Sequence, residues 1–341
     1  MDCSGPGLSR RRRGRGFEYR DEAGRRVTDE AVLDRVRDLA IPPAWNEVWI
    51  CPYPNGHLQA TGVDAAGRKQ YRYHDAWRER RDQEKFDAML DFAAALPRMR
   101  RRVRRDLRGG DLDRARVLAC ATRLLDLGFF RTGGEEYADE NESYGLATLR
   151  KRHVRIEPDG VVFDYEAKSG QRRVQRIADR GVRDIVAALR RRRGGGSELL
   201  AYRAGRRWVD VRSDDINEYV KAATAERHSA KDFRTWNATV LAAVALATEE
   251  PRDTRAARRR AVRAAVETVA AFLGNTPAVC RASYIDPRVI DRYESGWTIA
   301  PALERAGGAP DLADQRTRTH IEAAVLDLIC EEAAPALRRA A

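Results

Sequence analysis

The sequence predicts an α+β fold in two parts: a small β-rich N-terminal domain, and a larger, mainly α-helical domain with a short β-hairpin. Strand-like segments fill about the first 75 residues, and helical spacing of apolar residues prevails after them. Apolar alternation returns once, at Val161, Phe163 and Tyr165. We therefore divide the chain into a leader at 1–16, an N-terminal domain at 17–77 and a C-terminal domain at 78–341.

The N-terminal part begins with a basic stretch. Residues 4–16 read SGPGLSRRRRGRG, and such a run of like charges predicts a flexible basic leader. Ala23-Gly24 predicts a turn, and Pro42-Pro43 ends a helix. The expected elements are a strand, turn and return at 16–27, a helix at 28–39, and strands at 45–52, 57–64 and 67–74.

The C-terminal part is mostly helical by the spacing of its apolar residues. A long helix is expected at 75–107, broken at Pro97 because proline lacks the amide N–H that a helix interior needs. A hairpin on the Pro-Asp-Gly turn at 158–160 interrupts the helices, and Lys168 falls at a hairpin tip. Further helices are expected at 113–129, 177–192, 214–226, 232–248, 254–274 and 316–333.

Length and charge restrict the class of protein. A chain of 341 residues can bury the cores of two domains. The 64 basic and 52 acidic residues leave a net charge of +12, which favours a polyanionic partner such as nucleic acid. An arginine-rich proteome would give the same excess. Only six of the 64 basic residues are lysines, which leaves 58 arginines.

Several other classes have no support in the sequence. The five cysteines are scattered and form no CxxC pair, so neither a zinc site nor a disulfide framework is expected. No apolar run reaches the roughly 18 residues of a membrane span, and the N-terminus lacks the apolar core of a signal peptide. We expect no metal, no cofactor and no membrane association, and a cytoplasmic location.

Four basic side chains are candidates for chemistry, although each has a structural explanation when taken alone. Arg131 follows an apolar helix, as a capping residue does. Lys168 could be an ordinary exposed lysine at a turn. Lys231 and Arg234 lie three residues apart, so they share a helix face that could simply be solvated.

The stretch LGNTPAVCRASYIDP, residues 273–287, supplies two more candidates. Asn275 follows Gly274 after a long helix, and such a pair is first of all a helix C-cap. Tyr284 could be a core aromatic. The stretch has no histidine, so a nucleophilic tyrosine here would need helpers from elsewhere in the chain.

Taken together, these residue types suit attack on a phosphodiester. Arginines bind the non-bridging oxygens of the transition state bidentately. The leaving alkoxide needs a proton, which arginine cannot supply but a lysine among other cations can. In a chain that uses lysine so rarely, Lys168 has the character of a general acid. Tyr284 can hold the phosphate as an ester.

The order Arg, Lys, Lys-x-x-Arg, Asn, Tyr resembles that of type IB DNA topoisomerases, in their short poxvirus-like and bacterial form. The resemblance covers about residues 17–300 and excludes the leader and 301–341. The matching strings are ENESYGLATLRKRHV after the first catalytic arginine, KDFRTW as the Lys-x-x-Arg-Thr box, SYIDPRVI as the nucleophile segment, and IPPAWNEVWICP and GRKQYRYH in the N-terminal domain.

The resemblance implies a role for each residue. Tyr284 would attack one DNA strand, form a 3′-phosphotyrosine and free a 5′-hydroxyl. Arg131 and Arg234 would bind the non-bridging oxygens, Lys168 would protonate the leaving 5′-oxygen, and Lys231 would assist that transfer. Swivelling and religation would then relax positive and negative supercoils without ATP or a metal.

Two positions depart from the family pattern. Most members have histidine where this chain has Asn275, which can donate an amide N–H but cannot carry charge. Its stabilisation of the transition state should be weaker than that of histidine by about 1 kcal/mol. Bacterial members also have asparagine there. Poxvirus enzymes have a lysine where this chain has Gly134, so their target sequence need not be shared.

The resemblance also implies a clamp around duplex DNA, formed by the N-terminal and catalytic domains. Gln70, Tyr71 and Tyr73 match family positions that touch DNA in the major groove, and Tyr137 matches a contact near Arg131. On a strand, the two tyrosines share one face and Gln70 lies on the other. The alternative is a half-buried strand with core tyrosines.

Two other functions remain open from the sequence. Tyrosine recombinases share the catalytic domain, but normally have a helical front domain and histidine at the position of Lys231. In a non-enzymatic DNA-binding protein, the basic surface would act alone and Tyr284 would be structural. We expect a monomer that binds double-stranded DNA and associates with the nucleoid.

Overall fold

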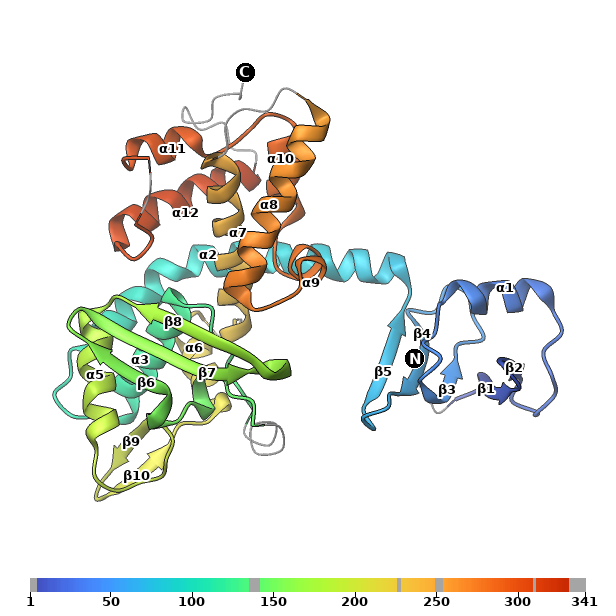
Figure 1. Ribbon diagram of the computed structural model, residues 1–341, viewed down its shortest axis with the longest axis horizontal. Helices are drawn as coiled ribbons and strands as arrows, with labels where there is room; N and C mark the ends of the chain where they lie inside the picture. The colour runs from blue at the N-terminus through green and yellow to red at the C-terminus, as the bar shows by residue number, and fades with distance from the viewer. Residues whose placement is uncertain (1–4, 135–141, 226–227, 249–253, 309–310, 331–341) are drawn as a thin grey trace. The chain divides into compact units, whose positions relative to one another are not determined.

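The structure is a computed structural model that describes residues 5–134, 142–225, 228–248, 254–308 and 311–330. The chain forms two compact units, Met1–Phe86 and Asp87–Ala341. They join within helix α2, Asp75–Leu107 (Figure 1). The predicted organisation, a small β-rich part before a mainly helical part with small sheets, is confirmed.

The described part of the first unit is an antiparallel five-stranded sheet with helix α1 and the start of α2. Its strand order is β2-β1-β3-β4-β5. Helix α1 supplies Val36 to a core that also contains Ile50 and Ala60 from the sheet. The elements are β1 (Leu8–Arg13), β2 (Gly16–Arg20), α1 (Glu30–Asp38), β3 (Asn46–Ile50), β4 (Leu58–Val63) and β5 (Lys69–Tyr73).

The leader prediction is wrong for residues 8–13, which form strand β1 between β2 and β3. Leu8 packs against the core, and the Arg10 guanidinium donates hydrogen bonds to the carbonyl oxygens of Ile41, Pro42 and Trp45. The arginines are therefore part of a paired strand. Their charge density suggested solvation, but a strand needs only alternate side chains directed inward.

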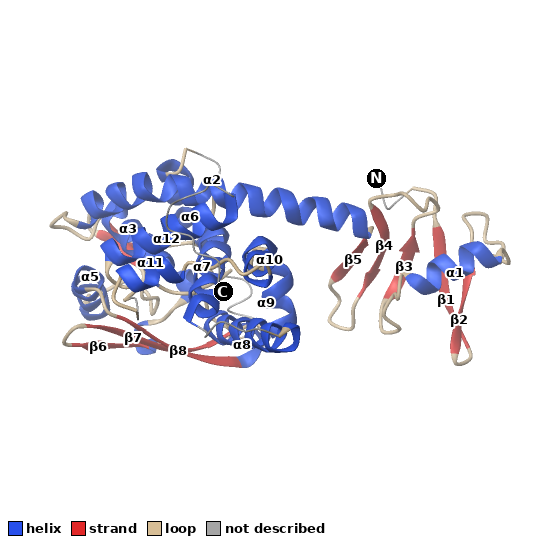
Figure 2. Ribbon diagram, turned by 90° about the horizontal axis from the view of Figure 1, so that it is seen from above, coloured by secondary structure: helices blue, strands red, loops and turns tan. Residues whose placement is uncertain are grey.

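The second unit is a helical assembly with a three-stranded sheet along one side (Figures 1 and 2). Helix α7 lies at its centre and packs against α3, α8, α10, α11 and α12. The helices after α2 are α3 (Arg114–Leu127), α5 (Arg180–Arg191), α6 (Ser213–Ala223), α7 (Ala230–Thr248), α8 (Arg255–Leu273), α9 (Pro277–Ser283), α10 (Pro287–Glu294), α11 (Ala300–Arg305) and α12 (Gln315–Cys330).

The sheet of the second unit extends the predicted hairpin by one strand. It runs β6 (Val154–Glu157), β7 (Gly160–Ala167) and β8 (Gln171–Ile177), antiparallel throughout. A 3₁₀ turn, Lys168–Gly170, connects β7 to β8 and carries Lys168. A separate two-stranded sheet, β9 (Ala201–Ala204) and β10 (Arg207–Asp210), was not expected.

Helix α2 also differs from the prediction, because it continues through Pro97 without a break. Leu96 and Met99, on either side of the proline, are fully buried in the core of the second unit. Packing of this apolar face offsets the loss of one hydrogen bond at proline.

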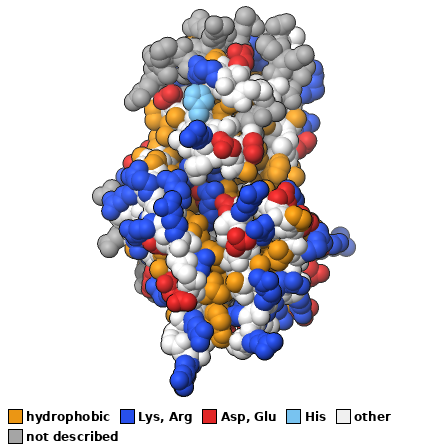
Figure 3. All heavy atoms as spheres, turned by 90° about the vertical axis from the view of Figure 1, so that its left-hand side faces the viewer, with side chains coloured by type: hydrophobic (Ala, Val, Ile, Leu, Met, Phe, Trp, Pro, Cys, Tyr) orange, Lys and Arg blue, Asp and Glu red, His pale blue; other side chains and the backbone are white. Residues whose placement is uncertain are grey.

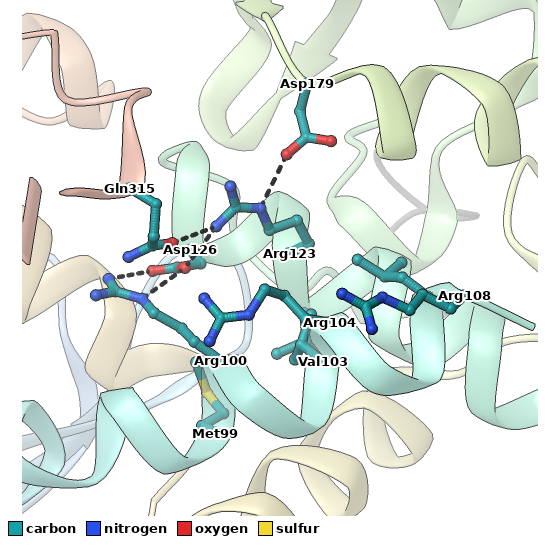
Figure 4. A pocket seen from close by; sticks show the side chains of 11 residues that line it. Met99, Arg100, Val103, Arg104, Arg108, Arg123, Asp126, Asp179 and Gln315 are labelled. Carbon is teal, nitrogen blue, oxygen red and sulfur yellow. Dashed lines mark hydrogen bonds and ion pairs between the residues drawn. The ribbon is translucent and has the colours of Figure 1, made fainter.

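A buried ion-pair network joins three helices of the second unit. Arg100 on α2 donates to both oxygens of Asp126 on α3, at 2.9 and 2.8 Å, and to Glu322 on α12. Arg318 bonds Glu322 at 2.9 Å and lies 3.2 Å from Asp126. Figure 4 shows Asp126 between Arg100 and Arg123. Every charge in the network has a partner of opposite sign.

This network makes stability depend on pH. Burial alone would raise the pKa of Asp126, but Arg318 and Arg100 outweigh burial and hold it well below its usual range. A carboxylate with a depressed pKa stabilises the fold above its unfolded-state pKa of about 4, and its contribution is lost as the pH falls through the folded-state pKa.

We expect Asp126→Asn to lower the free energy of unfolding by about 3–5 kcal/mol, because it leaves buried guanidiniums with one carboxylate fewer. Urea unfolding followed by tryptophan fluorescence measures this, and the difference from wild type should narrow below about pH 4. The matched control is Asp184→Asn at the exposed Arg183–Asp184 pair, with an expected cost below about 1 kcal/mol. If both variants lost the same unfolding free energy, the stabilising role given to the buried network would be wrong.

Candidate active site

A pocket of about 430 Å³ in the second unit brings the predicted basic residues together with Tyr284. Four cations line it, and no carboxylate is among the described residues that do so. The lining residues are Arg131, Thr132, Gly133, Gly134, Ser143, Tyr144, Gly145, Lys168, Ala230, Lys231, Arg234 and Tyr284. Asn275, the sixth predicted catalytic residue, contacts this group through Arg131.

The C-terminal end of α8 holds three guanidiniums close together. Arg173 donates to the carbonyl oxygens of Ala271, at 2.9 Å, and Phe272. Arg234 donates to Leu273 O at 3.0 Å, and Arg131 to Gly274 O at 3.3 Å. Four consecutive carbonyls thus accept from arginines. The last carbonyls of a helix have no partner within it and carry partial negative charge, so they suit cations.

Gly274 makes this arrangement possible. It ends α8 in the left-handed conformation, with φ +63°, where only glycine is unstrained. A Cβ at this position would lie 3.0 Å from Nη1 of Arg173. The glycine therefore turns the chain toward Asn275 and leaves room for the guanidinium.

Asn275 is oriented by Arg131. Its Oδ1 accepts a hydrogen bond from Nη2 of Arg131, and because a guanidinium can only donate, the oxygen must face it. The amide nitrogen, Nδ2, then points elsewhere: it is buried and has no hydrogen-bond partner among the described residues. A buried donor without an acceptor is costly, so this N–H is ready for an acceptor supplied by a ligand.

Arg234 is the most buried cation of the site, at 5% exposure. Besides Leu273 O it donates to the carbonyl oxygen of Phe129, just after α3. Its Nε is buried without a partner among the described residues. Burial, and then the like charge of Arg131, lower the pKa of Arg234 to about 10. The group is still charged at neutral pH, and no carboxylate among the described residues is paired with it.

Tyr284 caps the short helix α9, and its ring lies beside Arg234, with the guanidinium carbon 5.3 Å from the ring centroid. Burial alone would raise the pKa of the Tyr284 hydroxyl, but Arg234 and then Arg131 outweigh burial and hold it below its ordinary value. The arginines therefore favour the phenolate, which is the nucleophilic form of tyrosine.

The loop that carries Arg131 is fixed by close backbone packing. Gly133, with φ +86°, and Gly145 touch so closely that a Cβ on Gly145 would lie 2.4 Å from Cα of Gly133. Leu146 N–H donates to Arg131 O at 2.8 Å. Side chains larger than hydrogen would separate the two segments and move Arg131.

The two lysines differ from the arginines in exposure. Lys168, in the turn after β7, and Lys231, in the first turn of α7, are exposed and line the pocket from two elements distant in sequence. An exposed ammonium on a flexible stem can approach a ligand that enters the pocket.

The expected DNA contacts in the first unit lie on β5. Tyr71 is 48% exposed, so it is not a core residue. Its ring stacks on that of Tyr73 at 6.1 Å, and Tyr73 stacks on Trp77 at 4.5 Å. Gln70 donates to Asp64 at 2.9 Å. The fourth expected contact, Tyr137, lies outside the described residues.

Sequence reasoning missed Arg173. It lies on β8, five residues after Lys168, and its role depends on carbonyls about 100 residues further along the chain, at 271 and 272. Arg173 could be identified only by knowing that strand β8 lies beside the end of α8. In a chain so rich in arginine, no local signal distinguishes this one.

A second cavity, of about 270 Å³, lies beside the buried network (Figure 4). Arg100 and Arg123 line it, and Arg123 is bonded to Asp179, Asp126 and Gln315. Its buried arginines are thus neutralised by carboxylates, unlike those of the first pocket. No tyrosine is among its described lining residues, so we assign the chemistry to the first pocket.

The described part of the chain shows neither a metal-binding cluster nor a membrane-spanning helix. No cluster of three or more His, Cys, Asp or Glu side chains there could hold a metal ion. No described helix is both long and apolar enough to cross a membrane.

The chain matches known families over most of its length. Residues 74–299 match the family described as eukaryotic DNA topoisomerase I, catalytic core, and residues 16–64 match the bacterial DNA topoisomerase IB N-terminal domain. These matches and the cation-lined tyrosine define the protein as an enzyme of the DNA topoisomerase class.

Individual relatives agree. DNA topoisomerase 1B of Acanthamoeba polyphaga mimivirus is 30% identical over 297 residues, which cover 85% of this chain and 88% of the relative. DNA topoisomerase 1B of vaccinia virus (strain Copenhagen) is 27% identical over 107 residues, 31% of this chain and 34% of the relative. DNA topoisomerase 1 of Candidozyma auris is 29% identical over 160 residues, 46% of this chain and 20% of the relative.

The chain therefore belongs to the type IB DNA topoisomerase family. The predicted resemblance is confirmed. A purely DNA-binding protein and a tyrosine recombinase, the two alternatives, are disfavoured because the matched core is that of a topoisomerase and the front unit is a β-sheet.

Asn275 offers a direct test of the site geometry. We expect Asn275→Ala to slow single-turnover DNA cleavage about tenfold, the effect of one neutral hydrogen bond, with little change in DNA affinity. Asn275→Asp should be slower still, because it would put a carboxylate where the amide N–H would face a bound phosphate. Rapid-quench assays of covalent complex measure both. An Asp variant as fast as the Ala variant would mean that Nδ2 does not face the phosphate.

Proposed function

We propose that the pocket cleaves one strand of duplex DNA through a 3′-phosphotyrosine at Tyr284 and reseals it, relaxing supercoils of either sign without ATP or a metal. The observation that supports this most is the pocket itself, which four cations and a tyrosine with a lowered pKa line, with no carboxylate among the described lining residues. A phosphodiester in the pocket would supply the missing negative charge.

The reaction conserves the number of phosphoester bonds. The Tyr284 oxygen bonds to phosphorus after its proton passes to solvent, and the bond from phosphorus to the 5′-oxygen breaks. Lys168 gives a proton to that oxygen, and Lys231 assists the transfer. The broken strand rotates about the intact one, and the 5′-hydroxyl then attacks the phosphotyrosine and releases Tyr284. Ester exchange needs no external energy.

Arg131, Arg234 and Asn275 bind the non-bridging oxygens of the transferring phosphate. Both arginines are already fixed by the α8 carbonyls, so little reorganisation is needed when charge develops. The unpartnered donors, Nε of Arg234 and Nδ2 of Asn275, support this assignment because each requires an acceptor. Among the described residues that line the pocket, there is no acidic side chain that the arginines would have to leave first.

DNA binding involves both parts of the chain in this proposal. Residues 17–77 serve as a DNA-binding domain, in which Gln70, Tyr71 and Tyr73 contact the major groove, and residues 78–341 form the catalytic domain. Tyr137 contacts DNA near Arg131. Basic side chains are spread over one face of the second unit, with acidic ones between them (Figure 3). They provide sequence-independent attraction to phosphates.

We further propose that the protein acts as a monomer on double-stranded DNA in the nucleoid of the cytoplasm. One pocket in one chain contains five of the six side chains that the chemistry requires, and the sixth, Asn275, is hydrogen-bonded to Arg131 of that pocket. The four lining cations, the nucleophile and Asn275 all come from the second unit.

Tyr284→Phe tests the nucleophile. The variant should bind duplex DNA as wild type does but relax supercoiled plasmid at no detectable rate, because no phosphoester can form. The matched control is Tyr219→Phe, which removes the hydroxyl of a buried tyrosine, bonded to Asp106 at 2.8 Å; it should relax plasmid normally. Relaxation by Tyr284→Phe would refute the assignment.

Lys168→Ala tests the general acid. Cleavage of ordinary DNA should slow by about 10²-fold or more. Cleavage should recover when the 5′ leaving atom is sulfur, because a thiolate leaves without protonation. Lys221→Ala, at an exposed lysine on α6, is the control and should change neither rate. If the sulfur substrate were cleaved as slowly as ordinary DNA, Lys168 would have another role.

A further inference from the structure

We propose that Thr239 is a positioning residue for the nucleophile: its hydroxyl holds the backbone on both sides of Ile285 and so sets the place of the Tyr284 ring. The inference rests on the proposed role of Tyr284. It concerns how α7 and the segment after α9 are joined.

The hydroxyl of Thr239 makes two hydrogen bonds to the nucleophile segment. The side chain is on α7 and fully buried. Its Oγ1 accepts from Asp286 N–H at 3.1 Å and donates to Tyr284 O at 3.3 Å. The directions follow because an amide N–H only donates and a carbonyl only accepts. Met89 Sδ, at 3.5 Å, is a weaker acceptor for the same proton.

These bonds are unusual for a threonine within a helix. Such a hydroxyl commonly bonds the carbonyl four residues earlier in its own helix. Thr122, equally buried on α3, does so with Leu118 O at 2.9 Å. Thr239 instead bonds a segment 45 and 47 residues away. Its hydroxyl therefore determines tertiary geometry.

Helix α7 consequently contacts Tyr284 at two places, its ring and its backbone carbonyl. Arg234 lies beside the ring of Tyr284, and Thr239, five residues later on the same helix, holds its backbone carbonyl. A helix is rigid over such a distance, roughly 1.5 Å per residue along its axis. The ring is thereby held at a fixed place relative to the arginine that binds the phosphate.

The backbone after Ile285 is also anchored, by Asp286. Asp286 is fully buried, caps α10 by accepting from Arg288 N–H at 2.9 Å, and accepts from the Arg288 guanidinium at 2.8 Å. Loss of the Thr239 hydroxyl would thus release mainly the Tyr284 carbonyl, while Tyr284 N–H keeps its bond to Cys280 O at 3.0 Å. In-line attack depends steeply on alignment, and misplacement by about 1 Å costs about 10²-fold in rate.

The test compares Thr239→Val, which removes the hydroxyl at nearly constant volume, with Thr239→Ser, which keeps it. We expect Val to slow single-turnover covalent complex formation about tenfold or more, and Ser to stay within about threefold of wild type. DNA affinity, measured in a Tyr284→Phe background, should not change. Thr122→Val, which removes an equally buried hydroxyl bonded within its own helix, should cleave at the wild-type rate.

The outcomes separate this inference from the proposed function. If wild type formed no covalent complex, the proposed function would fail. If wild type cleaved and folded Thr239→Val cleaved equally fast, with only its melting temperature lowered, Thr239 would be merely structural and the inference would be wrong. Should Val not fold, Thr239→Cys replaces it, because a thiol is a weak donor and acceptor. Its rate should fall below that of Thr239→Ser, and a wild-type rate would overturn the inference.

Discussion

The C-terminal carbonyl oxygens of α8 hold three arginines together, and the active site depends on this contact. Two unit charges about 5 Å apart repel by about 3 kcal/mol at an effective dielectric of 20. In this protein Arg131, Arg173 and Arg234 bond four successive carbonyls at residues 271–274, whose dipoles offset part of that repulsion. The cations can therefore converge before any phosphate is present.

The hydrogen-bond partners of these three arginines are neutral carbonyls, so the arginines keep their charge. A second arginine cluster in the same unit shows the contrast. Arg100 and Arg318 are bonded to Asp126 and Glu322, so their charge is cancelled and serves stability. Carbonyl dipoles position a guanidinium without cancelling it. The charge around Tyr284 thus remains uncancelled and lowers the pKa of the Tyr284 hydroxyl.

Much of this fold could be predicted from the sequence because apolar periodicity reports burial directly. The exceptions have physical causes. Strand β1 is rich in arginine, and its charge hid a pattern that only pairing with β2 and β3 reveals. Pro97 stays within α2 because buried neighbours hold the helix together. The short helices α9–α11 and the strands β9 and β10 are too brief for periodicity to identify.

The candidate site also contains residues that could be predicted from the sequence and residues that could not. Its chemical residues could be found because their types and order along the chain suit phosphoryl transfer, and because they resemble a family. The residues that hold them could not. Arg173 and Thr239 act through backbone atoms of segments 45 to 99 residues away, and the contact between segments is a property of the folded chain alone.

The central claim is that Tyr284 becomes covalently joined to DNA through a 3′ phosphate. Its most direct test traps the complex on a duplex labelled at the 5′ end of the cleaved strand, digests it with trypsin and identifies the modified peptide by mass spectrometry. The account predicts that the label stays with the protein, on the peptide of residues 282–288, with the nucleotide on Tyr284. Attachment to another residue would contradict it. So would release of the 5′-labelled fragment while the protein stays joined to the other fragment of the cleaved strand.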